Sequence, residues 1–193
     1  NLIEKFSTIA IGGGMANTFL LANKKNIGNS LIEENLIEEA LNIQLKAKKY
    51  NCKLILPVDV VCGKNIEDTK PTYRKIEEIS SDDMILDIGK ITTKFINEEI
   101  INSKMLLWNG PVGAFEYKPY DKATNEIAKT IKSNAKKLNI DTLAGGGDTI
   151  SAIKKTDAED GFNYLSNAGG AFLEWLEGNE SPGVIALKEN NYN

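Results

Sequence analysis

Ile140-Asp-Thr-Leu-Ala-Gly-Gly-Gly-Asp-Thr149 holds the pattern that decides the fold. A short apolar run, Ile140–Ala144, is typical of a buried strand, and three glycines separate it from a predicted helix over Asp148–Lys155. The same order recurs at Ser7–Ile11, followed by Gly12-Gly13-Gly14, and at Met105–Trp108, followed by Asn109-Gly110-Pro111. Strands that alternate with helices predict an α/β fold, a three-layer Rossmann-like domain with a mostly parallel sheet and helices on both faces.

The rest of the chain continues this alternation. Further strands are predicted at Lys53–Leu56, Val58–Cys62, Met84–Ile88 and Asn163–Ser166, and further helices at Met15–Ala22, Leu31–Lys49, Thr92–Ile101, Asp121–Lys137 and Ala171–Leu176. Ser30, with Glu33 three residues later, has the pattern of a capping box at a helix start. The polar stretch Asn65–Ser81 is predicted to be an irregular connection. We expect residues 1–193 to form a single domain, with 188–193 as a loosely held tail.

Composition narrows the possible functions. Apolar residues make up 41% of the chain and charged residues 26%, which is typical of a globular protein. A net charge of −4, with Arg74 as the only arginine, argues against a nucleic-acid partner. The absence of histidine excludes a histidine base and a histidine-bound metal. No apolar run has membrane-spanning length. Cys52 and Cys62 are expected to be buried free thiols in a reducing, cytoplasmic protein.

Four glycine-containing loops follow predicted strands: Gly12–Gly14, Asn109–Gly113, Gly145–Thr149 and Gly169–Ala171. One such cluster alone is most simply a tight turn. In a parallel sheet, however, the carboxyl ends of the strands share one edge, and ligands bind there. Backbone N–H groups at glycines and helix starts bind phosphate. The four loops together therefore predict a site for a phosphate-bearing nucleotide.

Two well-known nucleotide motifs are absent. The chain has no G-x-x-x-x-G-K-[ST] sequence, so it lacks a Walker-type phosphate loop. It also lacks G-x-G-x-x-G, the fingerprint of dinucleotide-binding oxidoreductases. A nicotinamide-dependent dehydrogenase domain therefore stays an alternative without its specific signal.

Individual polar residues near the loops allow two interpretations each. Asp148 fits either an N-cap or a ligand of Mg²⁺, which proteins usually hold through one or two carboxylates. Thr149 beside it could donate to a phosphate. Glu116 is either a solvated surface charge or an acceptor for ribose hydroxyls. Trp108 and Phe115 are expected in the core rather than as stacking surfaces for a base.

Six segments in order carry a family resemblance: Ile11-Gly-Gly-Gly-Met-Ala-Asn-Thr-Phe19, Leu56-Pro-Val-Asp-Val-Val61, Leu86-Asp-Ile-Gly89, Trp108-Asn-Gly-Pro-Val-Gly-Ala-Phe-Glu116, Gly145-Gly-Gly-Asp-Thr149 and Ala168-Gly-Gly-Ala-Phe-Leu-Glu-Trp-Leu-Glu-Gly178. Together they resemble the C-terminal, nucleotide-binding domain of phosphoglycerate kinase, up to about Leu187. The resemblance implies a two-domain glycolytic kinase that moves a phosphoryl group between 1,3-bisphosphoglycerate and ADP, giving 3-phosphoglycerate and ATP, with Mg²⁺. The full-length protein is then expected to be a monomer.

The resemblance also assigns roles to residues. It implies that Gly12, Gly13 and Gly14 line an adenine pocket with Leu86 against the base, and that Asn109, Gly110, Pro111 and Val112 contact the nucleotide. Glu116 would hold the ribose. Gly146, Gly147, Asp148 and Thr149 would surround the phosphates, with Asp148 toward the metal. Gly169 and Gly170 would supply backbone donors to the phosphoryl group, and Gly147 and Gly170 are the catalytic candidates.

Some positions depart from the family pattern. Lys90 stands where proline is usual and Ile85 where glycine is usual, and Asn167-Ala168 replaces the commoner Thr-Gly. The family's catalytic lysines lie on a Gly-Ala-Lys-Val-like segment before the first glycine run, and its basic N-terminal domain grips the acidic substrate. We expect this chain to be a fragment without either part, which binds Mg-ADP or Mg-ATP without turnover. The alternative is a stand-alone nucleotide-binding module.

Overall fold

The computed structural model describes residues 2–170 and residue 178 of the 193-residue chain. The strands are β1 (Thr8–Ala10), β2 (Lys53–Ile55), β3 (Asp59–Gly63), β4 (Thr72–Lys75), β5 (Met84–Ile88), β6 (Met105–Asn109), β7 (Asp141–Gly145) and β8 (Tyr164–Ser166). The helices are α1 (Gly13–Ala22), α2 (Ile37–Lys49), α3 (Lys90–Asn102), α4 (Lys122–Leu138) and α5 (Gly147–Lys155). The predicted helix over 171–176 and the tail 188–193 lie outside the described residues.

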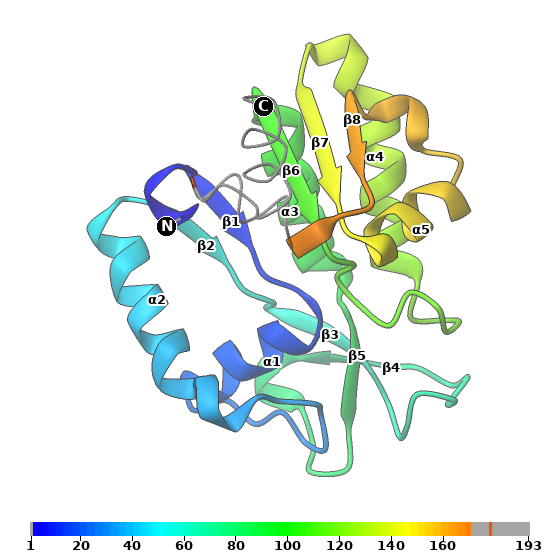
Figure 1. Cartoon of the computed structure of the whole chain (residues 1–193). Helices are drawn as coiled ribbons and strands as arrows, with labels where there is room; N and C mark the ends of the chain where they lie inside the picture. Colours follow the sequence, from blue (N-terminus) through cyan, green and yellow to red (C-terminus); the bar gives the residue numbers. More distant parts are fainter. Residues whose placement is uncertain (1, 171–177, 179–193) are drawn as a thin grey trace, which may run out of the picture.

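The strands confirm the α/β class and add one feature that the sequence did not predict. β6, β7 and β8 form a parallel sheet in that order, and β1 pairs with β2, also in parallel. β4, β3 and β5 form a separate antiparallel sheet. Figure 1 shows the β6–β7–β8 sheet with α4 and α5 beside it, and the antiparallel sheet at the other end of the molecule. The stretch predicted as an irregular connection contains β4.

The largest core cluster lies around the parallel sheet. Helix α4 contributes Ala123, Ile127, Ile131 and Ala135, which are spaced by four residues and face the same side. They pack with Trp108 and other buried residues from β2, β5, β6, β7, α3 and α5. A second cluster joins α1 and α2 to the β1–β2 pair. These contacts hold the carboxyl ends of the strands rigidly in place, because densely packed interiors deform little.

The predicted helix start at Ser30 is wrong. Helix α2 begins at Ile37, and the Ser30 hydroxyl donates to the carbonyl oxygen of Ile27 and accepts from the N–H of Ile85 at 2.8 Å. Ser30 is buried, so its hydroxyl satisfies backbone groups that would otherwise lack partners. A tertiary contact between distant segments thus replaces the local cap.

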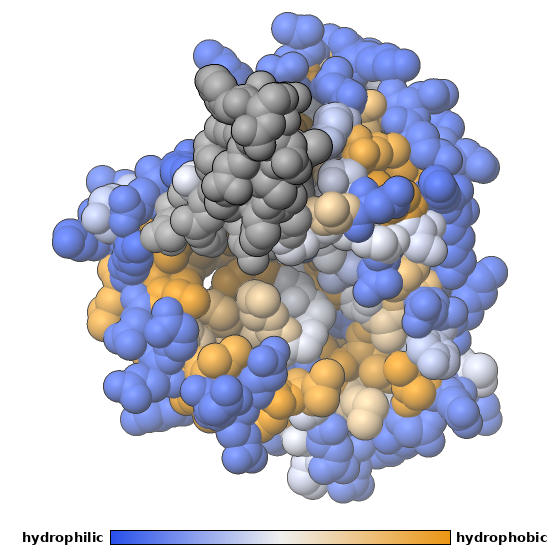
Figure 2. Space-filling view, viewed as in Figure 1, coloured by the Kyte–Doolittle hydropathy of each residue, from blue (hydrophilic) through white to orange (hydrophobic). Residues whose placement is uncertain are grey.

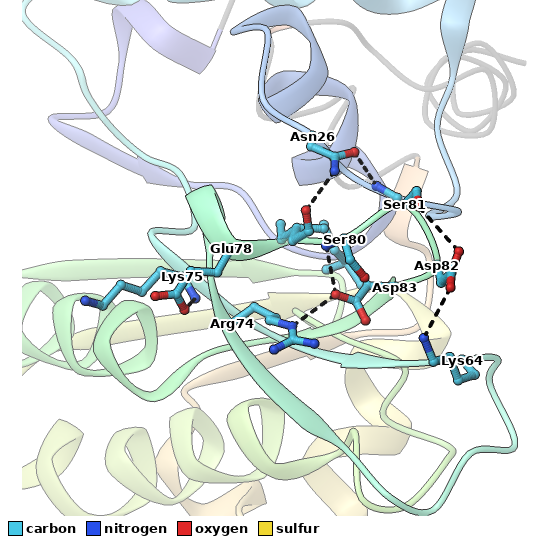
Figure 3. Close-up of polar contacts among 12 residues, drawn as sticks. Asn26, Lys64, Arg74, Lys75, Glu78, Ser80, Ser81, Asp82 and Asp83 are labelled. Carbon is cyan, nitrogen blue, oxygen red and sulfur yellow. Dashed lines mark hydrogen bonds and ion pairs between the residues drawn. The ribbon is translucent and has the colours of Figure 1, made fainter.

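The only arginine anchors the antiparallel sheet. Arg74 Nε donates to Asp83 Oδ2 at 3.0 Å, and the N–H of Ser80 donates to the same oxygen at 2.9 Å. Figure 3 shows Arg74 and Ser80 converging on Asp83. The Asp83 side chain is only 3% exposed. Although burial opposes ionisation, these donors keep the pKa of the Asp83 carboxyl below its ordinary value.

Arg74→Met is expected to lower the free energy of unfolding by about 1–3 kcal/mol at pH 7, because it leaves a buried carboxylate without its cation. The loss should shrink as the pH falls through the lowered pKa of Asp83, since a protonated carboxyl no longer needs the cation. Urea unfolding at several pH values measures this. Lys129→Met, which removes an exposed charge from α4, is the control. An equal loss in both variants would contradict the assignment.

Candidate functional site

Three of the four glycine loops meet at the carboxyl edge of the β6–β7–β8 sheet. Asn109 at the end of β6 pairs with Gly145 at the end of β7, which in turn pairs with Ser166 at the end of β8. The N–H of Gly146 donates to the Ser166 carbonyl at 3.0 Å. The predicted convergence is thus observed within the residues that the structure describes.

The first glycine loop joins the same region through one backbone contact. The N–H of Gly13 donates to the carbonyl oxygen of Val112 at 2.9 Å, linking the start of α1 to the loop after β6. Figure 2 shows that this face of the molecule is hollowed near its centre, with apolar residues around the hollow and hydrophilic residues at the rim. All four predicted loops, as far as residue 170, therefore lie around one surface.

The loops after β7 and β8 are in backbone contact. A Cβ atom placed on Gly169 would lie 2.7 Å from Gly146 Cα and 3.3 Å from Asn109 Oδ1. A real side chain does not fit at such a distance, so only glycine lets the two loops approach this closely. By contrast, no atom of the described residues would lie within 4 Å of a Cβ on Gly147 or Gly170. The other described loops therefore leave room at these two glycines.

Helix α5 starts at this edge, and none of the side chains in residues 2–170 caps its first N–H groups. Its N-cap is Gly146, which has a φ of 97° and a ψ of 140°, a conformation that is essentially restricted to glycine. Asp148 lies in the first turn, is exposed, and makes no side-chain cap hydrogen bond. The N-cap interpretation of Asp148 is therefore wrong. Free N–H groups at a helix start attract anions through partial positive charge.

Thr149 has a structural contact of its own. Its side chain is 1% exposed, and Oγ1 accepts from the N–H of Gly110 at 2.7 Å. The hydroxyl therefore ties the start of α5 to the loop after β6. Among the hydrogen bonds of the described residues the hydroxyl acts only as an acceptor, so its proton can still be donated.

Loop 109–116 is fastened to its surroundings by hydrogen bonds along its length. They are Trp108 Nε1 to Gly110 O at 2.7 Å, Val112 N to Thr124 Oγ1 at 3.2 Å, Ala114 N to Leu86 O at 2.7 Å, and Lys155 Nζ to Phe115 O at 2.9 Å. The rings of Trp108 and Phe115 are each 7% exposed, which confirms that they belong to the core. Glu116 is exposed at the end of this loop.

Leu86 is more enclosed than its predicted contact with a base suggests. It is 8% exposed and packs with Val61, Tyr120 and Ala114. Leu31, predicted as the first residue of a helix over Leu31–Lys49, is 76% exposed and lies beside Gly14, where a Cβ would be 3.4 Å from Leu31 Cδ2. No local pattern indicated this position, because Leu31 lies far along the chain from the glycine run.

The positions that depart from the family pattern have ordinary partners. Ile85 packs against a core cluster that includes Leu20 and Ile27, and Lys90 Nζ lies 5.8 Å from the centre of the Tyr73 ring. The N–H of Ala168 donates to Ser166 Oγ at 3.3 Å. Asn167 is exposed.

The chemistry of a metal at this edge is limited by its donors. Within residues 2–170 and 178, no cluster of three or more His, Cys, Asp or Glu side chains could hold a metal ion. Asp148 alone could supply a carboxylate, which fits Mg²⁺, because that ion keeps several waters and is shared with substrate phosphates. Cys52 and Cys62 are buried and free, as expected, and burial raises the pKa of the Cys62 thiol to about 12.

The described part of the molecule also contains a hollow away from the glycine loops. A hollow of about 280 Å³ lies between β2 and α3, lined by Lys53–Leu56, Val58, Phe95, Glu98 and Glu99. None of the glycine loops lines it. None of the described helices is both long enough and apolar enough to cross a membrane.

Comparison with known proteins gives a consistent result. The sequence model described as "Phosphoglycerate kinase" matches residues 1–179. The chain is 44% identical over 190 residues to a phosphoglycerate kinase of Chelativorans sp. (strain BNC1), covering 98% of this chain and 48% of that protein. It is 46% identical over 189 residues to one from Caulobacter vibrioides (strain NA1000 / CB15N), covering 97% and 48%. The chain thus spans about half the length of these relatives.

Solved structures agree with the sequence comparisons. The structure of phosphoglycerate kinase from Coxiella burnetii superposes with a TM-score of 0.90 at 35% identity, over 98% of this chain and 48% of that one. Phosphoglycerate kinase from Pyrococcus horikoshii OT3 gives a TM-score of 0.76 at 25% identity, over 94% and 45%. With a family match over most of its length and a matching fold, the chain belongs to the phosphoglycerate kinase family.

Proposed function

We propose that this chain is the C-terminal, nucleotide-binding half of a phosphoglycerate kinase. The observation that carries the proposal is the meeting of the loops after β6, β7 and β8 with the uncapped start of α5 and the exposed carboxylate of Asp148. Phosphates at this edge would receive N–H donors and the positive end of the helix dipole. Family membership adds the nucleotide, ADP or ATP, to this phosphate chemistry.

The proposed site has a place for each part of the nucleotide. Gly146, Gly147 and Thr149 would lie against the phosphates, and Asp148 would hold Mg²⁺, which would supply positive charge beside them. The ribose lies near Glu116. The base lies on Gly12, Gly13 and Gly14, with Leu31 as an apolar surface and Leu86 supporting the loop from beneath. Asn109, Gly110, Pro111 and Val112 line the space between them.

Phosphoryl transfer requires positioning and charge stabilisation more than covalent chemistry. Backbone N–H groups at Gly147, Gly169 and Gly170 can supply part of that stabilisation. The whole protein would transfer the phosphoryl group between 1,3-bisphosphoglycerate and ADP, with the carboxylate-bearing substrate held by cations of the other half. We therefore expect the chain alone to bind Mg-ADP and to show no turnover with ADP and 1,3-bisphosphoglycerate. Measurable turnover by the chain alone would contradict the proposal that the other half is needed for catalysis.

Asp148→Asn is expected to weaken Mg-ADP binding about tenfold, because the variant loses a charged ligand of the metal. Without Mg²⁺, the affinity for ADP should not fall, since the same change removes a negative charge beside the phosphates. Isothermal titration calorimetry, with and without a chelator, measures both affinities.

Asp141→Asn is the matched control, because Asp141 is exposed at the opposite end of β7. Its affinity for Mg-ADP should equal that of the unaltered chain. Equal losses with and without Mg²⁺ would contradict a metal at Asp148. Saturable binding of NAD instead of ADP would contradict the kinase assignment and favour a dehydrogenase domain.

A further inference from the structure

Asp87 is a buried carboxyl group directly beneath the candidate site. It lies in β5 and is 2% exposed. Its Oδ2 accepts from the N–H of Ala123, in the first turn of α4, at 3.0 Å, and its Oδ1 accepts from the N–H of Ile88 at 2.9 Å. Since α4 has no side-chain cap of its own, Asp87 takes that role from a neighbouring strand.

Loop 109–116 rests on the same strand. A Cβ on Gly113 would lie 2.7 Å from Asp87 Cγ and 2.8 Å from Asp87 Cα, so the loop backbone is in direct contact with this residue. The next residue, Ala114, donates its N–H to Leu86 O at 2.7 Å. The loop is also tied to α4, since Val112 N donates to Thr124 Oγ1 at 3.2 Å. Asp87 therefore connects the loop to the start of α4.

Several groups around Asp87 shift the pKa of its carboxyl in opposite directions. Burial raises the pKa of its carboxyl to about 7, against the opposing effect of the two N–H donors. Asp121 also raises it, while Lys122 lowers it; Lys155 of α5 faces Asp121 at 3.5 Å. From the other elements packed against it, β3 presents Val61 and the loop presents Gly113, neither of which is charged.

This arrangement costs stability at neutral pH. The pKa in the folded state lies above the ordinary value of 3.8, so the unfolded chain releases the proton first as the pH rises. The contribution to stability is complete below the ordinary pKa of 3.8 and is lost as the pH rises through the folded-state pKa of about 7. A buried carboxyl that weakens the fold under a candidate site suggests a functional role, because perturbed groups concentrate at such sites.

We propose that Asp87 is a positioning residue for nucleotide binding: its ionised carboxylate holds the start of α4, and through it loop 109–116, in the arrangement that the nucleotide requires, and its protonation weakens the hydrogen bonds to this carboxyl group. The step follows from donor counting. An ionised carboxylate accepts both N–H groups, whereas a protonated one has an O–H in place of one acceptor. The N–H of Ala123 or of Ile88 then faces a hydroxyl oxygen, which is a weaker acceptor than a carboxylate oxygen. This proposal rests on the proposed function, because the loop is assigned to the nucleotide only there.

The sequence makes the proposal easy to test. There is no histidine, the side chain that ordinarily titrates near neutral pH. Trp108 donates to Gly110 O at 2.7 Å and so reports on the loop by its fluorescence. Trp175 is the other tryptophan, and Trp175→Phe leaves Trp108 as the only one. In this background, the nucleotide-free chain should show a fluorescence transition with a midpoint near the Asp87 pKa, about 7.

Asp87→Asn should abolish that transition, because its amide does not titrate, whereas Asp141→Asn should keep it. Calorimetry should show that Mg-ADP binds about tenfold more weakly at pH 6 than at pH 8 in the unaltered chain. The terminal phosphate of ADP itself titrates near pH about 6. The ADP phosphate titrates in the same way with Asp87→Asn, so its effect cancels when the two proteins are compared. The part of the pH dependence that is due to Asp87 should be missing in the variant.

A fluorescence transition that persists in Asp87→Asn, or none in the unaltered chain, would overturn the proposal. If Asp87→Asn does not fold, the amide shifts of Gly113 and Ala123 in the unaltered chain replace it. They should titrate with the same midpoint, and constant shifts would overturn the proposal. Absence of Mg-ADP binding at every pH would instead contradict the proposed function. In that case the titration without nucleotide still tests whether Asp87 controls the conformation of the loop.

Discussion

Gly169→Ala is expected to weaken Mg-ADP binding about a hundredfold. The new Cβ would lie 2.7 Å from Gly146 Cα and 3.1 Å from Gly146 N, so the loops after β7 and β8 must move apart. Overpacking of this kind costs about 1–3 kcal/mol, and the upper end corresponds to a factor of about 100 in affinity. The N–H groups at the start of α5 would then no longer match the phosphates. Calorimetry measures the affinity, and urea unfolding measures the accompanying loss of stability.

Gly170→Ala is the matched control for stability, because no atom of residues 2–170 would lie within 4 Å of a Cβ at this neighbouring glycine. Its unfolding midpoint should equal that of the unaltered chain. If Gly169→Ala binds Mg-ADP normally, the contact between the two loops has no part in the site.

Gly28→Ala is expected to give the largest loss of stability, about 3–4 kcal/mol. Gly28 has a φ of +56°, which costs an L-residue about 1–2 kcal/mol. Its Cβ would also overlap the carbonyl oxygen of Asp83 and lie 2.6 Å from that of Ser80. These are backbone atoms of the turn that holds Arg74 and Asp83 together, so they move less easily than a side chain.

Gly110→Ala separates the two causes, because Gly110 has a φ of +100° and its Cβ would meet no described atom within 4 Å. It should lose only about 1–2 kcal/mol, the conformational part of the cost. Chemical denaturation gives both values. Similar losses in the two variants would show that the overlap at Gly28 is relieved without strain.

Patterns of apolar spacing predicted the parallel part of the fold well. Helix α4 was expected over Asp121–Lys137 and spans Lys122–Leu138, because its apolar residues recur at helical spacing over the whole length. β6 and β7 were expected as apolar runs before glycines and are found there. In these elements, local preference and tertiary packing favour the same structure.

The failures share one physical cause, which is competition from residues distant in the sequence. Ser30 has the right type for a helix cap, but its hydroxyl satisfies Ile27 and Ile85 instead. β4 was missed because none of its residues is buried, so its pairing with β3 leaves no apolar pattern in the sequence. No local pattern predicts that Asp87 caps α4 from another element, since the contact depends on where two separate segments meet.

The sequence predicted which backbone loops form the candidate site, but not the local structure around Asp148. Glycine positions indicated which loops would gather, because glycine is required where backbones approach closely. The details of Asp148 were not predictable. Whether an aspartate after a glycine run caps the helix depends on which residue becomes the N-cap, and here Gly146 takes that position.

Amide chemical shifts on titration with Mg-ADP test the central claim most directly. The account predicts the largest changes at Gly13, Gly110, Gly146 and Asp148, and none at Asp141, at the opposite end of β7. Changes confined to the hollow between β2 and α3, or no saturable change at all, would contradict the placement of a nucleotide at the carboxyl edge of the sheet.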